Sequence, residues 1–235
     1  MKLTKNKLVF GAAALIVLIL ALLGNKLRGA DVGVTLDAGY VSDYIRRGVP
    51  HADESVQARL NVTIPVEFKF LGVTNVYGKA FLNNPLEDGV GTTRDLYVGT
   101  VFGTELVQLD VGARYLSVFG GDNSNEVYAG AKLDVFGNPG VYACRGTSDD
   151  FNSYELRVQE AVKWGLLPVQ VATTVNGRVG HRDGPVETTF YQAGLNAGYP
   201  LNDNVQVYAG VAYGGTSTDL YDDVVAYTVG VRSEF

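Results

Sequence analysis

The sequence is poor in the residues on which many binding and catalytic sites depend. Its 235 residues include one cysteine, two histidines, one methionine and one tryptophan. The single Cys144 excludes a disulfide scaffold, and so few His and Cys side chains argue against a transition-metal site. Basic residues are outnumbered, 19 Lys and Arg against 25 Asp and Glu, and a net charge of −6 repels nucleic acid. We expect no cofactor, no metal ion and no nucleic-acid partner.

Residues for nucleophilic catalysis are equally scarce. A Ser or Cys nucleophile needs a nearby histidine that a third group orients. The two histidines, His51 and His181, lie in predicted loops, and neither is followed two positions later by serine. Asp183 beside His181 forms a candidate acid–base pair, although a loop aspartate is more often simply solvated. Cys144 shares an expected lipid-facing side with Tyr142, which favours an apolar filler over a thiolate. We predict that the protein is not an enzyme.

Long apolar runs are confined to the start of the chain. Lys2, Lys5 and Lys7 precede a stretch without charge over 8–24. A basic start followed by an apolar centre is typical of a signal for export through the Sec pathway. The stretch also approaches the length of a membrane-spanning helix, so an uncleaved anchor is the alternative. We predict a signal peptide over 1–24.

Glycine and tyrosine are abundant, with 29 and 14 residues, and this composition favours strands and turns over helices. From Asp31 onward, apolar residues recur at every second position, which is the period of a β-strand. Clear examples run over 32–40, 55–64, 107–115, 126–134, 169–175, 191–199 and 205–213. We count twelve such segments with no linker between them, and predict one all-β domain over 31–235.

Alternating strands fit either a soluble sandwich or a membrane barrel, whose apolar face meets lipid and whose interior is polar. Charges in the middle of strands and apolar rows of Ala and Val favour the barrel. Tyr40, Tyr115, Tyr199 and Tyr213 end their apolar rows, where an interfacial aromatic girdle is expected. We predict a single antiparallel transmembrane β-barrel of about twelve strands in the outer membrane of a Gram-negative-type cell.

The connections between the predicted strands fall into two classes. Short ones are expected at 66–72, 103–106, 136–138, 163–166 and 200–203, and mostly longer, polar ones at 42–54, 83–93, 178–186 and 215–222. Short turns on the periplasmic side and long loops outside are typical of outer-membrane barrels. The least regular region, 160–168, is predicted to be a turn, with a short helix as the alternative.

The last strand alternates up to the final residue. Tyr227, Val229, Val231 and Phe235 form its apolar row, and Ser233 interrupts it. The row resembles the C-terminal signal by which the barrel-assembly machinery recognises outer-membrane barrels. We therefore expect that machinery, and the lipids and lipopolysaccharide of the outer membrane, as partners.

The predicted inner face carries charges of both signs. Its members are Asp37, Arg59, Lys79, Asp95, Asp110, Arg114, Glu126, Lys132, Asp134, Glu155, Arg157 and Arg232. A channel selective for one sign of charge shows one dominant sign along its path, so a balanced set favours a general polar pore. We predict a narrow porin-like passive channel for small polar solutes. The alternative is a closed, non-conducting barrel that serves envelope structure or surface display.

One predicted loop carries a local cationic patch of Arg46, Arg47 and His51. The patch either attracts acidic solutes or lipopolysaccharide phosphates at the mouth, or orders the loop through an ion pair of Arg47 with Asp43 or Asp53. We favour the ordering role.

The same loop carries a family motif. The stretch Ser42-Asp43-Tyr44-Ile45-Arg46-Arg47-Gly48-Val49 resembles the S-D-Y-x-x-R-G motif of the TorF-type (Gcw_chp) family of outer-membrane β-barrel proteins. The segments 95–99 and 126–130 are similar to its later strand repeats, whereas 49–51 departs from its usual continuation. The resemblance implies an exported barrel and contributes location and fold more than chemistry.

Overall fold

The structure is a computed structural model. It describes residues 32–46, 49–68, 72–87, 91–118, 123–147, 152–166, 169–183, 187–218 and 222–235. The signal peptide predicted over 1–24 lies outside these residues and stays a prediction. Among the described residues, no helix is long and apolar enough to cross a membrane.

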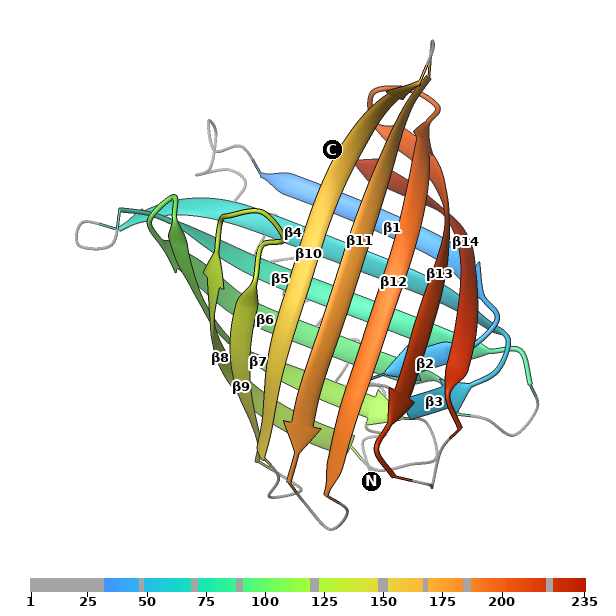
Figure 1. Ribbon diagram of the computed structural model, residues 1–235. Helices are drawn as coiled ribbons and strands as arrows, with labels where there is room; N and C mark the ends of the chain where they lie inside the picture. Colours follow the sequence, from blue (N-terminus) through green and yellow to red (C-terminus); the bar gives the residue numbers. More distant parts are fainter. Residues whose placement is uncertain are drawn as a thin grey trace, which may run out of the picture. The chain divides into compact units, whose positions relative to one another are not determined.

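Twelve strands close into one antiparallel barrel (Figure 1), which confirms the predicted fold class. The strands are β1 (Gly33–Val41), β4 (Ser55–Phe68), β5 (Gly72–Pro85), β6 (Thr93–Gly103), β7 (Val107–Val118), β8 (Asn123–Leu133), β9 (Gly140–Gly146), β10 (Asn152–Leu166), β11 (Val169–Arg182), β12 (Thr188–Pro200), β13 (Val205–Thr216) and β14 (Val224–Glu234). Each strand pairs with its neighbours in the chain, and β1 closes the ring by pairing with both β4 and β14. Closure leaves no free sheet edge, so the backbone hydrogen bonds are satisfied within the sheet.

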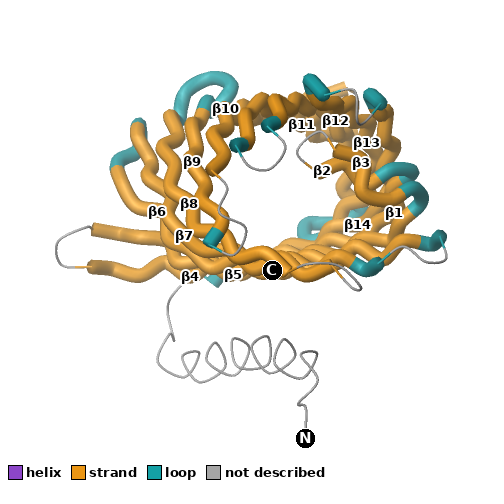
Figure 2. The backbone as a smooth tube through the Cα atoms, turned by 90° about the horizontal axis from the view of Figure 1, so that it is seen from below, coloured by secondary structure: helices purple, strands orange, loops and turns teal. Residues whose placement is uncertain are grey.

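The connection between β1 and β4 contains two further strands. β2 (Tyr44–Arg46) and β3 (Val49–Ala52) pair only with each other and share no backbone ladder with the barrel. β2 lies near β14, and β3 near β13. Figure 2 looks along the barrel and shows both strands on the inner side of the ring. The sequence analysis predicted this segment as one of the longer polar connections, without strands.

The alternation of side chains places apolar groups on the outside of the barrel and polar groups inside, the reverse of a soluble protein. Aliphatic side chains point outward and are exposed; Val98, Val141 and Val229 each expose more than half of their area. Charged side chains point inward, and Asp37 and Glu126 are buried there. An exposed aliphatic belt around a closed barrel is the arrangement that a hydrocarbon environment favours.

The connections also divide as predicted. Among the described residues, 104–106, 134–139 and 201–204 join strands at one edge, called here the turn edge. The opposite edge, where β1 ends and β4 begins, is called the loop edge. Several predicted boundaries were wrong by a few residues, most of all at two connections. Residues 163–166, predicted as a turn, belong to β10, and residues 178–182, predicted as a loop, belong to β11. A strand continues as long as its backbone is paired, even where its side chains stop alternating.

Aromatic rings that face inward lie against glycines of neighbouring strands, which accounts for much of the unusual composition. The Tyr208 ring covers Gly230, and the Tyr128 ring covers Gly112. A ring in this position fills little of the lumen because the glycine has no side chain. The Tyr208 hydroxyl then donates to Asp37, 2.6 Å away.

Tyrosines also gather on the outer face. Tyr199 and Tyr213 are exposed, as expected for a girdle, whereas Tyr40 and Tyr115 are half-buried. Near the loop edge, the hydroxyls of Tyr191 and Tyr213 both donate to Asp223. These two hydrogen bonds hold the pKa of the Asp223 carboxyl below its usual range.

We predict that Gly230→Ala destabilises the barrel. A Cβ at this position would lie 2.6 Å from the Ala38 carbonyl oxygen and 2.6 Å from the Tyr208 Cζ, so the ring must move. Overpacking of this kind costs about 1–3 kcal/mol, which is measured as a lower midpoint of urea unfolding followed by gel mobility. Gly33→Ala is the control, because nothing lies within 4 Å of the added atom. Equal midpoints for the two variants would contradict the packing described here.

Candidate functional site: the barrel lumen

Two cavities occupy the lumen side by side. The first, of about 390 Å³, is lined by β10 to β14, β1 and β4, and the second, of about 440 Å³, by β4 to β12. Tyr44, Ile45, Arg59 and Gln192 line both of them. The lumen is therefore not filled completely by side chains, as expected for a barrel with more than eight strands.

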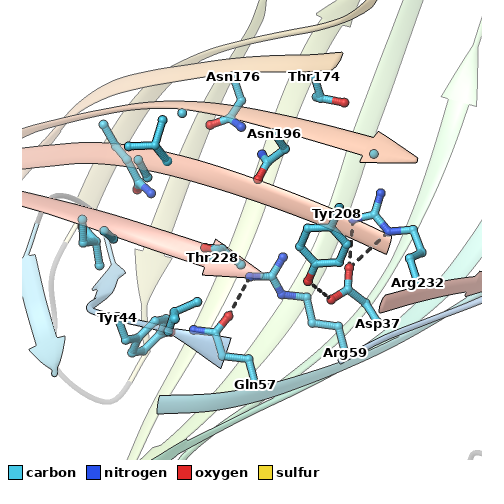
Figure 3. A pocket seen from close by; sticks show the side chains of 18 of the residues that line it. Asp37, Tyr44, Gln57, Arg59, Thr174, Asn176, Asn196, Tyr208, Thr228 and Arg232 are labelled. Carbon is cyan, nitrogen blue, oxygen red and sulfur yellow. Dashed lines mark hydrogen bonds and ion pairs between the residues drawn. The ribbon is translucent and has the colours of Figure 1, made fainter. Parts of the chain in front are cut away.

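The first cavity has a wall of neutral polar groups (Figure 3). Its amide and hydroxyl side chains are Gln57, Gln159, Thr174, Asn176, Gln192, Asn196, Gln206 and Thr228. Amides present donors and acceptors together, so this wall is able to hydrogen-bond uncharged polar solutes. Asp37, Asp43, Arg59 and Arg232 are the charged residues that line it.

The second cavity is lined by cations and rings. Its cations are Arg59, Lys79, Arg114, Arg157 and Arg178, and its rings include Tyr44, Tyr77, Phe81, Tyr97 and Tyr128. The carboxylates that line it are Asp95, Asp110 and Glu126.

Each cation that lines either cavity stands over an aromatic ring. The distances from the cation to the ring centroid run from 3.9 Å for Arg157 over Tyr142 to 5.5 Å for Arg232 over Tyr208. The other pairs are Arg59 over Phe81, Lys79 over Tyr77, Arg114 over Tyr97 and Arg178 over Phe190. Cation–π attraction stabilises a charge without neutralising it, so a stacked cation still attracts an anion in the lumen.

The carboxylates, by contrast, are set into the wall behind their partners. Asp95 and Glu126 are buried and both pair with Arg114, which is buried as well. Glu155 has no exposed side-chain surface, and its two oxygens lie 2.7 Å from Arg157 and 3.2 Å from Arg178. Asp95 and Glu126 therefore line the second cavity as buried, ion-paired carboxylates, and Glu155 does not line it.

Two further carboxylates accept hydrogen bonds from tyrosine hydroxyls. Asp37 accepts hydrogen bonds from Tyr208 and from Arg232, with the arginine Nη2 at 2.9 Å. Asp110 accepts from the Tyr77 hydroxyl at 2.6 Å. Charge-assisted bonds of this kind fix the orientation of the carboxylates toward the wall.

The exposed charge of the second cavity is positive. Arg59 and Lys79 are exposed, and among the described residues neither forms an ion pair; the Arg59 Nη2 donates to the neutral Gln57 at 3.2 Å. Arg157 keeps 41% of its side chain exposed while its carboxylate partner is covered. A narrow cavity between low-dielectric walls focuses this positive field.

Nine of the twelve predicted inner charges line a cavity, and Glu155 lies behind them. Lys132 lies at the turn end of β8 and is half-buried. Asp134 was misassigned: β8 ends at Leu133, so Asp134 is an exposed residue of the turn 134–139. It accordingly does not take part in the lumen wall.

Sequence reasoning missed or misplaced several residues of this site. Arg178 was hidden in a predicted loop, although continued pairing of β11 brings it opposite Arg157. Cys144 and Tyr142 were predicted on the lipid side, but both face inward: Cys144 pairs with Tyr128 and lines the second cavity. The predicted orientation of these two side chains was wrong because β9 has only seven residues, too few for the alternation to decide which face of the strand points to lipid. The amide side chains of the first cavity were missed because they form no sequence motif.

The hairpin β2–β3 brings Tyr44 and Ile45, two residues of the family-like motif, into the lumen. Ser42 turns the chain inward by pairing with β14: its amide donates to the Tyr227 carbonyl oxygen at 2.9 Å, and its hydroxyl accepts from the Tyr227 amide at 2.9 Å. Tyr44 and Ile45 are buried. The Tyr44 ring packs against Phe81 of the barrel wall at 5.5 Å and against His51 at 5.9 Å.

The predicted patch of Arg46, Arg47 and His51 is described only in part. His51 is exposed and contacts Tyr44, whereas Arg47 and the side chain of Arg46 lie outside the described residues. The predicted pairing of Arg47 with Asp43 or Asp53 therefore stays a prediction.

His181 lies on the outer face near the loop edge, away from the cavities. Its Nε2 lies 3.0 Å from Asp183, as the sequence suggested, and its Nδ1 lies 3.2 Å from the Thr189 hydroxyl. Glu187 is a second carboxylate beside it at 3.4 Å. The cluster ties the end of β11 to the start of β12.

The C-terminal row also faces outward. Tyr227, Val229, Val231 and Phe235 are all exposed on β14 or just after it. Recognition of this row by the assembly machinery stays a prediction.

Comparisons with known proteins place the fold among outer-membrane channels. The KdgM porin is similar over 86% of this chain and 99% of its own, with a TM-score of 0.51 and 13% identity. The NanC porin is similar over 85% and 98%, with a TM-score of 0.52 and 11% identity. An outer-membrane channel from Pseudomonas putida F1 is similar over 88% and 96%, with a TM-score of 0.55 and 9% identity. No protein family and no curated protein matches the sequence.

We predict that Arg114→Gln is strongly destabilising and Arg59→Gln is not. The first removes the Arg114 ion pairs of the buried Asp95 and Glu126, and loss of a buried ion-pair partner costs about 3–5 kcal/mol. The second removes an exposed charge that forms no ion pair with the described residues. Midpoints of urea unfolding for the two variants and the unchanged protein measure the difference. Similar midpoints would show that the wall carboxylates do not depend on Arg114.

Proposed function

We propose that the protein is a passive outer-membrane channel for small polar solutes and that it prefers anions. The observation that carries this proposal is the sorting of charge in the second cavity. Cations stand exposed on aromatic rings, and the buried acids Asp95, Glu126 and Glu155 are set into the wall. A solute in the lumen therefore meets positive charge first.

The anion preference refines the expectation of a neutral polar pore. That expectation counted charges of equal number, but a solute responds to the charges that it reaches. Electrostatic attraction falls when a charge is already paired and covered, as Glu155 is by Arg157 and Arg178.

Similarity to known channels supports the proposal. The KdgM and NanC porins share the fold, and one KdgM structure is described as a complex with disordered oligogalacturonate, an acidic saccharide. Small acidic saccharides are accordingly reasonable solutes for this chain. We further propose membership of the TorF-type (Gcw_chp) family, on the motif at 42–48. The same proposal includes export through the Sec pathway. It also includes the assembly machinery and lipopolysaccharide as partners, and it holds that the protein is not an enzyme.

The alternative is a non-conducting barrel for envelope structure or surface display. One observation favours it: the hairpin β2–β3 occupies part of the lumen, with Tyr44 and Ile45 buried there. Conductance separates the two functions directly.

In planar bilayers with a KCl gradient, we expect single-channel events. We also expect a reversal potential displaced from zero toward the equilibrium potential of chloride. The variant Arg59→Gln/Lys79→Gln removes two exposed cations of the second cavity that form no ion pair with the described residues, and it should move the reversal potential toward zero or beyond it. Arg94→Gln is the control, since it removes one positive charge from the outward face of β6, where Arg94 stands opposite Leu82, and should leave selectivity unchanged.

A complete absence of channel events from folded protein would overturn the channel. A cation-selective channel, or equal selectivity of the double variant and the unchanged protein, would overturn the anion preference. Gel mobility before and after boiling checks that each variant is folded.

A further inference from the structure

We propose that the hairpin β2–β3 is the constriction of the lumen, and that Tyr44 is the residue that sets both its width and its anion preference. The inference rests on the proposed channel function. It adds to that function the residue that determines which solutes pass through the lumen.

The hairpin stands between the two cavities. Tyr44 and Ile45 line both, and they share this position with Arg59 of β4 and Gln192 of β12, which come from the barrel wall. A solute that passes either cavity therefore passes these two hairpin side chains. The division separates a wall of amides from a wall of cations.

The position of Tyr44 is fixed by side-chain packing. Its ring lies 5.5 Å from Phe81, and Phe81 in turn carries the Arg59 guanidinium 5.1 Å from its centroid. Tyr44, Phe81 and Arg59 thus form one stack that runs from the hairpin to the wall. A change at Tyr44 is transmitted to the cation that lines both cavities.

The entrance of the hairpin is held by hydrogen bonds to β14. Ser42 forms two hydrogen bonds with Tyr227 of β14, and Ser42 Oγ donates to Asp43 at 2.8 Å. β2 and β3 have no backbone ladder with the barrel. Truncating the Tyr44 ring therefore widens the lumen without breaking the sheet.

Two consequences follow for transport. A wider opening conducts more, and a wider aqueous cross-section weakens the field of the cation wall, so selectivity falls as conductance rises. A hairpin that only stabilises the barrel would change neither quantity.

The test compares single-channel conductance and reversal potential for three variants of the full barrel. Tyr44→Ala should roughly double the conductance and move the reversal potential toward zero, because conductance scales with open cross-section. Tyr44→Phe keeps the ring and should stay much nearer to the unchanged protein than Tyr44→Ala in both quantities. Tyr199→Ala removes an exposed ring from the outer face and is the matched control.

Swelling of liposomes in sugars of increasing size gives a second measurement, in which Tyr44→Ala should admit a larger sugar than the unchanged protein. If the unchanged protein conducts and Tyr44→Ala behaves identically in both assays, the constriction is overturned and the channel stands. If only Tyr44→Ala conducts, the constriction is supported and the open channel is overturned. A further variant replaces residues 43–52 by a Gly/Ser linker in a folded barrel. If this variant, Tyr44→Ala and the unchanged protein all fail to conduct, the constriction and the channel function are both overturned.

Discussion

The stacking of inward cations on aromatic rings is the interaction on which the lumen depends. Rings such as Tyr208 lie against glycines of the next strand, so they take up little width, and cations such as Arg232 on their inner faces keep part of their surface exposed. The same rings bind carboxylates through their hydroxyls, as Tyr77 does with Asp110. One repeated unit therefore supports the wall, hides the acids and presents positive charge to solutes.

Closure of the barrel across β1 depends on the same units. Asp37 of β1 stands opposite Arg232 of β14 and Arg59 of β4, and its oxygens bind Arg232 and Tyr208. The strand that joins the two ends of the chain thus carries a satisfied charge at its centre. Beside this seam Ser42 binds Tyr227 of β14, and Tyr44 and Ile45 line the cavities, which links the closing strand to the hairpin in the lumen.

Much of the fold followed from the sequence because a closed barrel needs little beyond alternation. Period-two rows fixed the strand count and the outward face, and the inner position of charges such as Asp37 and Arg114 came with them. Boundaries were less accurate where alternation weakens, as at 163–166 and 178–182, and this hid Arg178. The burial of Glu155 between two arginines and the inward course of β2–β3 depend on contacts between distant segments, which no local pattern encodes.

Anomalous diffraction from crystals soaked in bromide tests the central claim most directly, because it locates anions without relying on transport. Exposed cations on rings should attract bromide to the second cavity, beside Arg59, Lys79 and Arg157. Bromide peaks at these side chains would agree with a lumen whose reachable charge is positive. A lumen free of bromide, or one that instead collects rubidium in a parallel soak, would contradict it.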